Sequence, residues 1–598
     1  MSERLLKGIG VSDGLAIGPA VVLQWVLPDV PHRVVSRTQV TKEIRRLRAA
    51  VRDVKGHMAA LRERAAVRAG EDQARILDAQ ILMLEDADFL NGIEELIRQN
   101  HLTAEKAFEF QVLEQRDAWS STGNARLKDR LADLNGIAIH VIRHLMRLGS
   151  VDLDSITEPS IVVARELGPG VTVQLDRAQV IGVICEEGTR TSHAAILAHS
   201  MGMPAVMGLR GALARIKPGV KVLLDATRGT VLLDPTPDEE AAARQVDQRR
   251  LAFVSDIERV TAPAVTTDGT RIALRGNVDL PEEIASAKEH GAEGVGLLRT
   301  EFLITGHDSL PTEDEQARYF RKVGQAFAGH PIVVRSYDLG GDKFPAPFQV
   351  SVEPNPQLGW RAIRVCLDEP DLFRTQIRAA LRAAADTDIQ FMIPLVTRLS
   401  EVERTRELVA EEGERLAQNG VTAARTMPLG VMVETPAAAI LADRLVEVSD
   451  FLSVGTNDLT QYTLVVDRGN ARLADRFTPH DPSVLRLLKL VADAARAAGK
   501  PASVCGEMAS EPLSAVLLIG LGYETLSVAP PSLPYIRYVV RQVSHAQARA
   551  AAAAALEART DVEVMQILRK AVDQSLDLTL LDDDVRLPGG RRSGSLKT

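Results

Sequence analysis

The C-terminal half of the chain alternates short apolar runs with helical segments, and this alternation limits the fold more strongly than any other feature. Segments such as IRAALRAAAD and LRLLKLVADAARAAG have the apolar spacing of amphipathic helices. They separate eight runs typical of buried strands: IALRGNV, GVGLLRTE, IVVRSYDLGG, IQFMIPLV, LGVMVETP, FLSVGTNDL, PASVCGEM and TLSVAP. Eight strand–helix repeats predict a (β/α)8 barrel. An open doubly wound sheet usually has fewer strands, and no GxGxxG loop follows the first run.

The N-terminal half has a different pattern. Residues before Leu27 alternate apolar side chains with Gly and Pro, as short strands do. From Val40 the pattern becomes helical, with apolar residues three and four apart at Ile44, Leu47, Val51, Val54, Met58 and Leu61. Strand-like runs return as SIVVARE, VIGVICEEG, PAVMG and VKVLLDA. The simplest topology is a small mixed α/β domain into which a helical bundle is inserted.

These patterns predict a multidomain α/β protein. We expect a mixed α/β domain at residues 1–35 and 149–236, an inserted helical bundle at 36–148, a connector helix and linker at 237–262, a barrel at 263–585 and a disordered tail at 586–598. The polar segment DEEAAARQVDQRRLAFVSDIERVT is also compatible with a plain surface helix. Its position between two differently patterned halves favours a connector.

Composition excludes several classes of protein. The 598 residues include 45% hydrophobic and 25% charged residues, as in soluble globular proteins. A net charge of −9 argues against nucleic acid as a partner, and no apolar run is long enough to predict membrane insertion. The three cysteines, Cys185, Cys366 and Cys505, are too few and too scattered for a disulfide framework or a metal knuckle. Because the N-terminus also lacks a secretory signal, we expect a cytoplasmic protein.

The segment GTRTSHAAILAHS places His193 where a helix is expected to begin. Thr191 and Ser192 are candidate N-caps, and a helix-favouring apolar run follows. The first turn of a helix attracts anions such as phosphate and disfavours the imidazolium form of a histidine. A neutral imidazole beside an anion site is suited to forming a phosphohistidine. A lone histidine at a helix start more often has a structural role. Whether His193 has a catalytic role therefore depends on the residues found in the rest of the chain.

Polar residues gather where the predicted barrel strands end, which is where barrels of this kind carry their active sites. The strand ends carry Arg299, Thr300, Glu301, Arg335, Asp338, Gly340, Gly341, Asp342, Lys343, Glu434, Asn457, Asp458, Arg468, Cys505, Gly506 and Glu507. Any one of them is explained by a salt bridge or a loop cap. The whole set at one end of one barrel indicates an anionic ligand.

The arginines of this set match an acidic, phosphorylated ligand. Arg299, Arg335 and Arg468 supply permanent charge and forked donors suited to phosphate and carboxylate. Arg361, in NPQLGWRAIR, is a candidate fourth member.

The remaining polar residues suggest a metal and a proton donor. Glu434 and Asp458 follow adjacent strands, and one or two carboxylates with substrate oxygens are the usual ligands of Mg²⁺. Asn457 can bond a substrate oxygen. Cys505 is the remaining group able to move a proton, although a buried inert thiol is the alternative.

Long segments of the chain resemble one family. GTRTSHAAILAHS is similar to the phosphohistidine signature of enzyme I of the bacterial phosphoenolpyruvate:sugar phosphotransferase system. GAEGVGLLRTEFL, DLGGDK, NPQLGWRAIR, MVETPAA, GTNDLTQYTLVVDRGN and CGEMA resemble its phosphoenolpyruvate-binding segments. The resemblance extends from KGIGVSDGLAIGPA to at least SVCGEMAS. His199 stands where many relatives carry arginine.

The resemblance implies a function for each candidate residue. His193 would carry the phosphoryl group, with Thr172 orienting its ring, and Cys505 would protonate the enolate of pyruvate. The phosphoenolpyruvate-binding positions would be Arg299, Arg335, Asn457, Asp458 and Arg468, supported by Arg361. Glu434 and Asp458 would bind Mg²⁺. The bundle would dock the phosphocarrier protein HPr, and the barrel would form a homodimer.

Two alternatives remain. Phosphoenolpyruvate synthase and pyruvate phosphate dikinase resemble the chain in the histidine domain and barrel, but they need a further large nucleotide-binding domain. A non-catalytic regulatory protein with the same fold would be expected to lack a site residue, whereas every expected position is filled. The sequence therefore predicts a phosphotransferase that moves phosphate from phosphoenolpyruvate to His193 and then to HPr.

Overall fold

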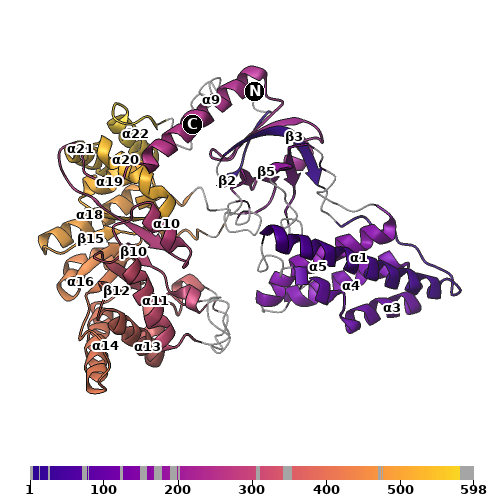
Figure 1. The fold of residues 1–598 in the computed structure, drawn as a ribbon, viewed down its shortest axis with the longest axis horizontal. Coiled ribbons are helices and arrows are strands. Elements are labelled where there is room, and N and C mark those ends of the chain that lie inside the picture. The colour runs from indigo at the N-terminus through magenta and orange to yellow at the C-terminus, as the bar shows by residue number, and fades with distance from the viewer. Residues whose placement is uncertain are drawn as a thin grey trace. The chain divides into compact units, whose positions relative to one another are not determined.

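A computed structural model describes residues 4–578, apart from 13, 24–26, 70–76, 79, 122–124, 149–155, 157, 168–177, 189–194, 196–197, 199–201, 305–309, 341–352, 354, 469, 471–472 and 474–475. The described residues form two compact units that divide between Arg249 and Arg250 (Figure 1). This division falls inside helix α9 (Pro237–Glu258), which lies within the segment 237–262 where a connector helix and linker are expected. The tail at 586–598, Thr172 and His193 lie outside the described residues.

The N-terminal unit contains a mixed eight-stranded sheet in the order β1-β8-β7-β3-β4-β5-β6-β2. Its strands are β1 (Leu5–Lys7), β2 (Ile9–Ser12), β3 (Leu15–Leu23), β4 (Ser160–Ala164), β5 (Val180–Cys185), β6 (Ala205–Met207), β7 (Lys221–Asp225) and β8 (Thr230–Leu233). Strands β3 to β6 run parallel, and the remaining neighbours are antiparallel. Val162 of β4 packs in one apolar cluster and Val163 in another, because successive side chains point to opposite faces.

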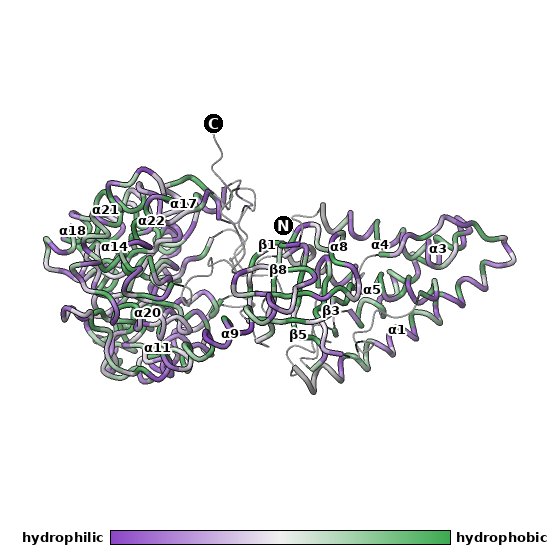
Figure 2. The backbone as a smooth tube through the Cα atoms, turned by 90° about the horizontal axis from the view of Figure 1, so that it is seen from above, coloured by the Kyte–Doolittle hydropathy of each residue, from purple (hydrophilic) through white to green (hydrophobic). Residues whose placement is uncertain are grey.

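Among the described residues between β3 and β4 are four long helices: α1 (Val40–Ala69), α3 (Ala87–Asn100), α4 (Ala104–Ser121) and α5 (Ala125–Met146). Along α1 and α5, hydrophobic and hydrophilic residues alternate (Figure 2). The apolar seam predicted for α1 is confirmed, since Leu47, Val51, Val54, Met58 and Leu61 are buried in the core of these helices. Ile44 packs against the same core. The exact domain boundaries given above stay a prediction.

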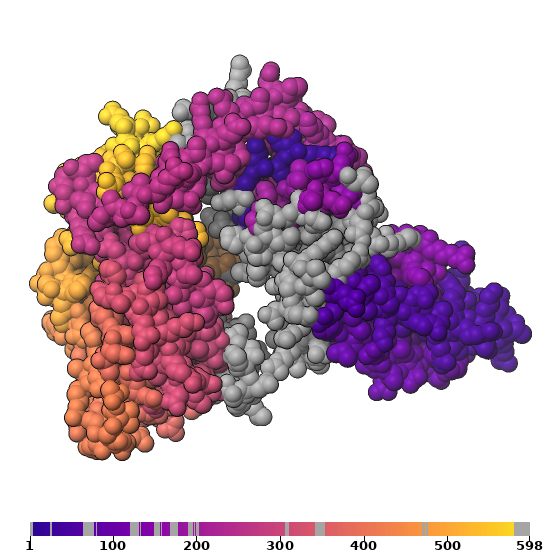
Figure 3. All heavy atoms as spheres, viewed as in Figure 1, coloured from indigo at the N-terminus to yellow at the C-terminus, as the bar shows by residue number. Residues whose placement is uncertain are grey.

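The C-terminal unit is a closed barrel of eight parallel strands, β9 to β16, which confirms the predicted (β/α)8 fold. The strands are β9 (Ala273–Val278), β10 (Val295–Leu298), β11 (Ile332–Arg335), β12 (Ile389–Ile393), β13 (Leu429–Val433), β14 (Phe451–Val454), β15 (Ala502–Val504) and β16 (Thr525–Val528), and each lies in one of the eight predicted runs. Successive repeats occupy successive parts of the unit's surface, from pink to yellow in Figure 3.

The longer helices that follow these strands are α10 (Glu283–Glu289), α11 (Glu313–Ala326), α13 (Pro370–Ala383), α14 (Leu399–Gln418), α16 (Ala442–Val448), α17 (Thr456–Leu464), α18 (Pro482–Ala497), α19 (Pro512–Leu521) and α20 (Leu533–Gln542). Two further helices, α21 (His545–Leu556) and α22 (Asp561–Val572), end the unit. They bury a large apolar core between helices and strands. Among the described residues, no helix has the length and apolar character to span a bilayer.

A second, smaller apolar cluster fills the inside of the barrel. Leu297, Val333, Met392, Met432, Phe451 and Cys505 form it. Gly430 of β13 makes room for the Phe451 ring, because a Cβ atom on Gly430 would lie 2.2 Å from that ring. The barrel interior therefore has no space for an additional methyl group at position 430.

We predict that Gly430→Ala destabilises the C-terminal unit by about 1–3 kcal/mol, since the Phe451 ring has to move within a packed interior. Thermal unfolding of the full chain would show a lower melting temperature. Gly56→Ala is the matched control, because a Cβ there meets nothing within 4 Å. Equal melting temperatures for the two variants would contradict this account of the packing.

Candidate active site

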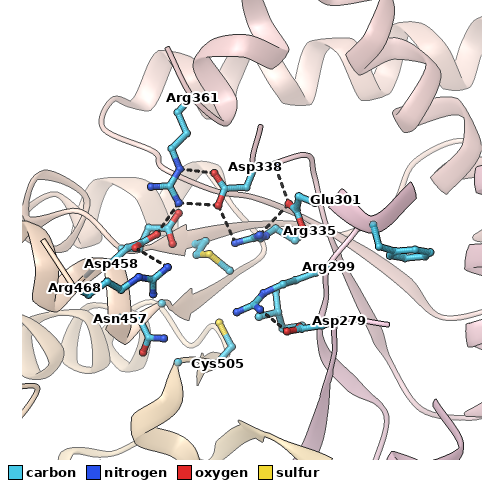
Figure 4. Close-up of a pocket in the computed structure, with 16 residues that line it drawn as sticks. Asp279, Arg299, Glu301, Arg335, Asp338, Arg361, Asn457, Asp458, Arg468 and Cys505 are labelled. Atoms are coloured by element: carbon cyan, nitrogen blue, oxygen red, sulfur yellow. Dashed lines mark hydrogen bonds and ion pairs between the residues drawn. The ribbon is translucent and has the colours of Figure 1, made fainter. Parts of the chain in front are cut away.

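A pocket of about 340 Å³ opens at the carboxyl ends of the barrel strands (Figure 4). Strand ends and the loops after them supply its walls: Asp279, Leu297, Arg299, Glu301, Phe302, Arg335, Asp338, Arg361, Met432, Glu434, Gly455, Asn457, Asp458, Arg468, Cys505 and Gly506. Eight predicted site residues meet here: Arg299, Arg335, Arg361, Glu434, Asn457, Asp458, Arg468 and Cys505. The structure brings all of them to one pocket.

Two buried arginines are held by one buried carboxylate. Asp338 accepts two hydrogen bonds from Arg361, to Oδ1 from Nε at 2.7 Å and to Oδ2 from Nη2 at 2.8 Å. The same carboxylate lies 3.3 Å from Nη1 of Arg335. Glu301 accepts from Nη2 of Arg335 at 2.9 Å, and Asp458 accepts from Nη2 of Arg361 at 3.0 Å. This chain of ion pairs fixes both guanidinium planes in the pocket wall.

Arg335 and Arg361 remain protonated despite their burial. Burial opposes the charge of Arg335, but Glu301, Asp338, Glu434 and Asp458 outweigh it and raise its pKa. The hydrogen bonds and charge of Asp338 likewise raise the pKa of Arg361 against the effect of burial. Both guanidinium groups therefore stay charged at every accessible pH, although carboxylates pair with them.

The other two arginines lie nearer to solvent. The Arg299 side chain is 41% exposed and pairs with Asp279, which follows β9. The Arg468 side chain is 48% exposed, and its Nη2 lies 3.8 Å from Oδ1 of Asp458. Long exposed side chains can turn toward a ligand, so these two suit a bound anion better than the buried pair does.

Glu434 and Asp458 are buried carboxylates that line the pocket. Oε1 of Glu434 accepts the Leu395 N–H at 2.6 Å, and Oδ1 of Asp458 is a buried oxygen that accepts no hydrogen bond from the described residues. Burial, and then the charges of Asp458 and Asp338, raise the pKa of Glu434. A divalent cation would relieve this repulsion and bind the unsatisfied oxygen. Because the described residues contain no cluster of three or more acidic, His or Cys ligands, such a cation would also need substrate or water oxygens.

Cys505 is a buried thiol whose sulfur points into the pocket (Figure 4). Burial raises its pKa to about 11, so it is protonated at neutral pH and can serve as an acid. Nearby, Nδ2 of Asn457 donates to the Glu507 carboxylate at 2.9 Å, and Oδ1 of Asn457 accepts the Glu507 N–H at 3.1 Å. These two bonds fix the Asn457 amide beside the pocket.

Sequence reasoning assigned no role to Asp279, and it noted Glu301 and Asp338 only as strand-end residues. Asp279 carried the same signal as the others, since it directly follows a predicted strand. The pairing of Asp338 with Arg361 carried no such signal, because it joins two loops 23 residues apart.

Comparisons with known proteins agree with this geometry. Models of PEP-utilising enzymes match three parts of the chain: the N-terminal domain at residues 7–130, the mobile domain at 156–229 and the PEP-binding domain at 256–545. Phosphoenolpyruvate-protein phosphotransferases from Geobacillus stearothermophilus and Bacillus subtilis (strain 168) are 37% and 35% identical to it over 569 residues each. The alignments cover 95% and 94% of this chain, and 98% and 99% of the relatives.

The chain belongs to the phosphoenolpyruvate-protein phosphotransferase family. The family resemblance seen in the sequence is confirmed, and so is the transferase activity expected from it. The pocket lies within the region that matches the PEP-binding domain. Phosphoenolpyruvate carries a phosphate and a carboxylate, and a pocket lined by four arginines and five carboxylates has groups to match both such an anion and a cation.

We predict that Glu434→Gln stabilises the metal-free phosphotransferase at pH 8. A carboxyl with a raised pKa destabilises the fold progressively as pH rises above its unfolded value of about 4.3, and the amide removes this penalty. The melting temperature should rise by about 2–4 °C for each kcal/mol of repulsion relieved. The gain should vanish near pH 4, and Mg²⁺ should stabilise the variant less than the wild type.

The surface variant Glu403→Gln is the control and should show neither effect. A Glu434→Gln variant that melts below the wild type at pH 8 and responds fully to Mg²⁺ would contradict the assignment of Glu434.

Proposed function

We propose that the phosphoryl group of phosphoenolpyruvate passes first to His193 and then to a histidine of the phosphocarrier HPr, as the first step of a sugar phosphotransferase system. The observation that carries this proposal is the convergence of four arginines and five carboxylates, three of them buried, on one pocket. Such a site supplies the positioning and charge neutralisation on which phosphoryl transfer depends.

Substrate binding would divide among the charged groups. Arg299, Arg335, Arg468 and the Asn457 amide would bind the phosphate and carboxylate oxygens, whereas Arg361 would act through Asp338 and Asp458. Glu434 and Asp458 would hold Mg²⁺, which would neutralise substrate charge when bound.

Cys505 would complete the first transfer. His193 attacks phosphorus in line, the bond from phosphorus to the enolate oxygen breaks, and phosphohistidine forms. The enolate then takes a proton at its methylene carbon, while the electron pair of the S–H bond stays on Cys505 as a thiolate. Water returns the proton to sulfur. An apolar surrounding keeps this acid protonated until the enolate forms.

The acceptor histidine has to serve two partners. His193 belongs to a region similar to the mobile domain of PEP-utilising enzymes, and it would swivel about α9 between the barrel pocket and HPr docked on the bundle. Thr172 would orient the ring. The protein would act in the cytoplasm, where its three buried free thiols stay reduced.

The barrel unit would also form a homodimer. Leu358 and Val465 are 66% and 86% exposed. They are close in sequence to Gln357 and Tyr462, which are joined by a hydrogen bond of 2.5 Å from the Tyr462 hydroxyl to the Gln357 carbonyl. Apolar residues exposed near one another would favour association with another surface.

We predict that His193→Ala abolishes acid-labile labelling by ³²P-phosphoenolpyruvate and transfer to HPr, because the acceptor nitrogen is lost. His330→Ala, which alters an exposed histidine of the barrel unit, should be labelled normally. Acid-labile phosphate on any other residue of the His193→Ala variant would contradict the proposed acceptor.

We predict that Cys505→Ala slows pyruvate formation by about 10²–10⁴-fold, the usual contribution of a general acid. Phosphate exchange between phosphorylated HPr and His193 does not need this acid and should continue. Stopped-flow detection of pyruvate beside an HPr exchange assay would separate the two steps, with Cys366→Ala as the buried-thiol control. Equal loss of both steps would contradict the acid role.

A further inference from the structure

We propose that Asn277 is a positioning residue that holds the main chain of Cys505 so that only the thiol can move. The inference rests on the proposed function, in which Cys505 is the proton donor. Asn277 belongs to β9 and does not itself line the pocket. Its effect on the reaction would therefore pass through Cys505.

The Asn277 amide bridges two elements of the barrel interior. Its Nδ2 donates to the Cys505 carbonyl at 3.1 Å, and its Oδ1 accepts from the hydroxyl of Ser527 at 2.6 Å. Ser527 is fully buried on β16 and also lies 3.2 Å from the Gly276 carbonyl. Because the Cys505 carbonyl can only accept, the amide is oriented with its N–H toward Cys505 and its Oδ1 toward the Ser527 hydroxyl.

The Cys505 carbonyl needs this partner because the sheet ends one residue earlier. The β15–β16 ladder pairs Ser503 with Thr525 and Val504 with Leu526, and it stops there. Asn277 comes from β9, which lies beyond β16 in the barrel, and its side chain reaches across to the carbonyl. It replaces the ladder hydrogen bond that the strand end leaves open.

The rest of the Cys505 main chain is held as firmly. The Cys505 N–H donates to the Val454 carbonyl at 3.0 Å on β14. Gly506 follows, and a Cβ there would lie 1.9 Å from Oγ1 of Thr456, so the chain passes too close to α17 for any other residue. With N–H, carbonyl and the next residue fixed, rotation about the Cα–Cβ bond is the remaining freedom.

That single rotation suits a proton donor. The Cys505 thiol lies 3.6 Å from the Val454 carbonyl, which gives it a resting partner before the enolate forms. Turning away from this carbonyl directs the S–H bond elsewhere without moving the main chain. A misplacement of about 1 Å at a reacting group can lower a rate by about 10²-fold, so a loosened carbonyl would slow protonation.

A double-mutant cycle on the full chain tests the proposal. Pyruvate release in a single turnover would be measured for Asn277→Ala, Cys505→Ala and the double variant, together with the KM for phosphoenolpyruvate. We expect Asn277→Ala to slow pyruvate release by about 10–100-fold with an unchanged KM. In the Cys505→Ala background it should cause no further loss, because a positioning residue acts only through the group that it positions.

Three further variants keep the test decisive if Asn277→Ala folds poorly. Asn277→Asp preserves the side-chain volume but sets an oxygen against the Cys505 carbonyl, so it should lose the same rate. Ser527→Ala frees the amide and should cause a smaller loss in the same step. The surface variant Asn419→Ala is the control and should match the wild type.

The outcomes distinguish the positioning role of Asn277 from the acid role of Cys505. A wild-type rate for both Asn277 variants, or an equal additional loss in the Cys505→Ala background, would overturn the positioning role alone. A Cys505→Ala variant that releases pyruvate at the wild-type rate would overturn the acid role and this inference with it.

Discussion

The ion pairs from Asp338 to Arg335 and Arg361 are the interaction on which the site depends. Both guanidinium groups and the carboxylate are at most 8% exposed, so each charge is stable only because the others face it. Removing one partner of a buried ion pair leaves an uncompensated charge and costs about 3–5 kcal/mol. Asp338 therefore decides where two of the four arginines lie, although it binds no substrate oxygen in our account.

Positive and negative side chains are interleaved in the pocket. Arg361 pairs with Asp338 and Asp458, whereas burial and the charge of Asp458 disfavour a negative charge on Glu434. The substrate would compensate the charge of the arginines, and the cation would compensate that of the carboxylates. The two should therefore bind together more tightly than either does alone. Cys505 lies at the edge of the same pocket but belongs to the apolar interior, which keeps its proton in place.

The sequence predicted all eight barrel strands because each is short, apolar and bounded by turn residues. It also predicted which polar residues would meet, since the carboxyl ends of barrel strands share one face. It could not predict that Asp338 pairs with Arg361, because that pairing depends on loop conformation. Asn277 was missed for a related reason: an inward polar residue within a strand gives no local signal, and its partner is 228 residues away. His193 and Thr172 were predicted from motifs, and their roles stay predictions.

In the proposed mechanism the barrel pocket alone binds phosphoenolpyruvate, and His193 serves only as acceptor. Calorimetric titration of the full chain with phosphoenolpyruvate and Mg²⁺ tests it most directly. We expect the His193→Ala variant to bind with wild-type affinity and Arg335→Ala to bind about 10–100-fold more weakly, as loss of a charged hydrogen bond predicts. Unchanged binding by Arg335→Ala, or loss of binding in His193→Ala, would contradict the account.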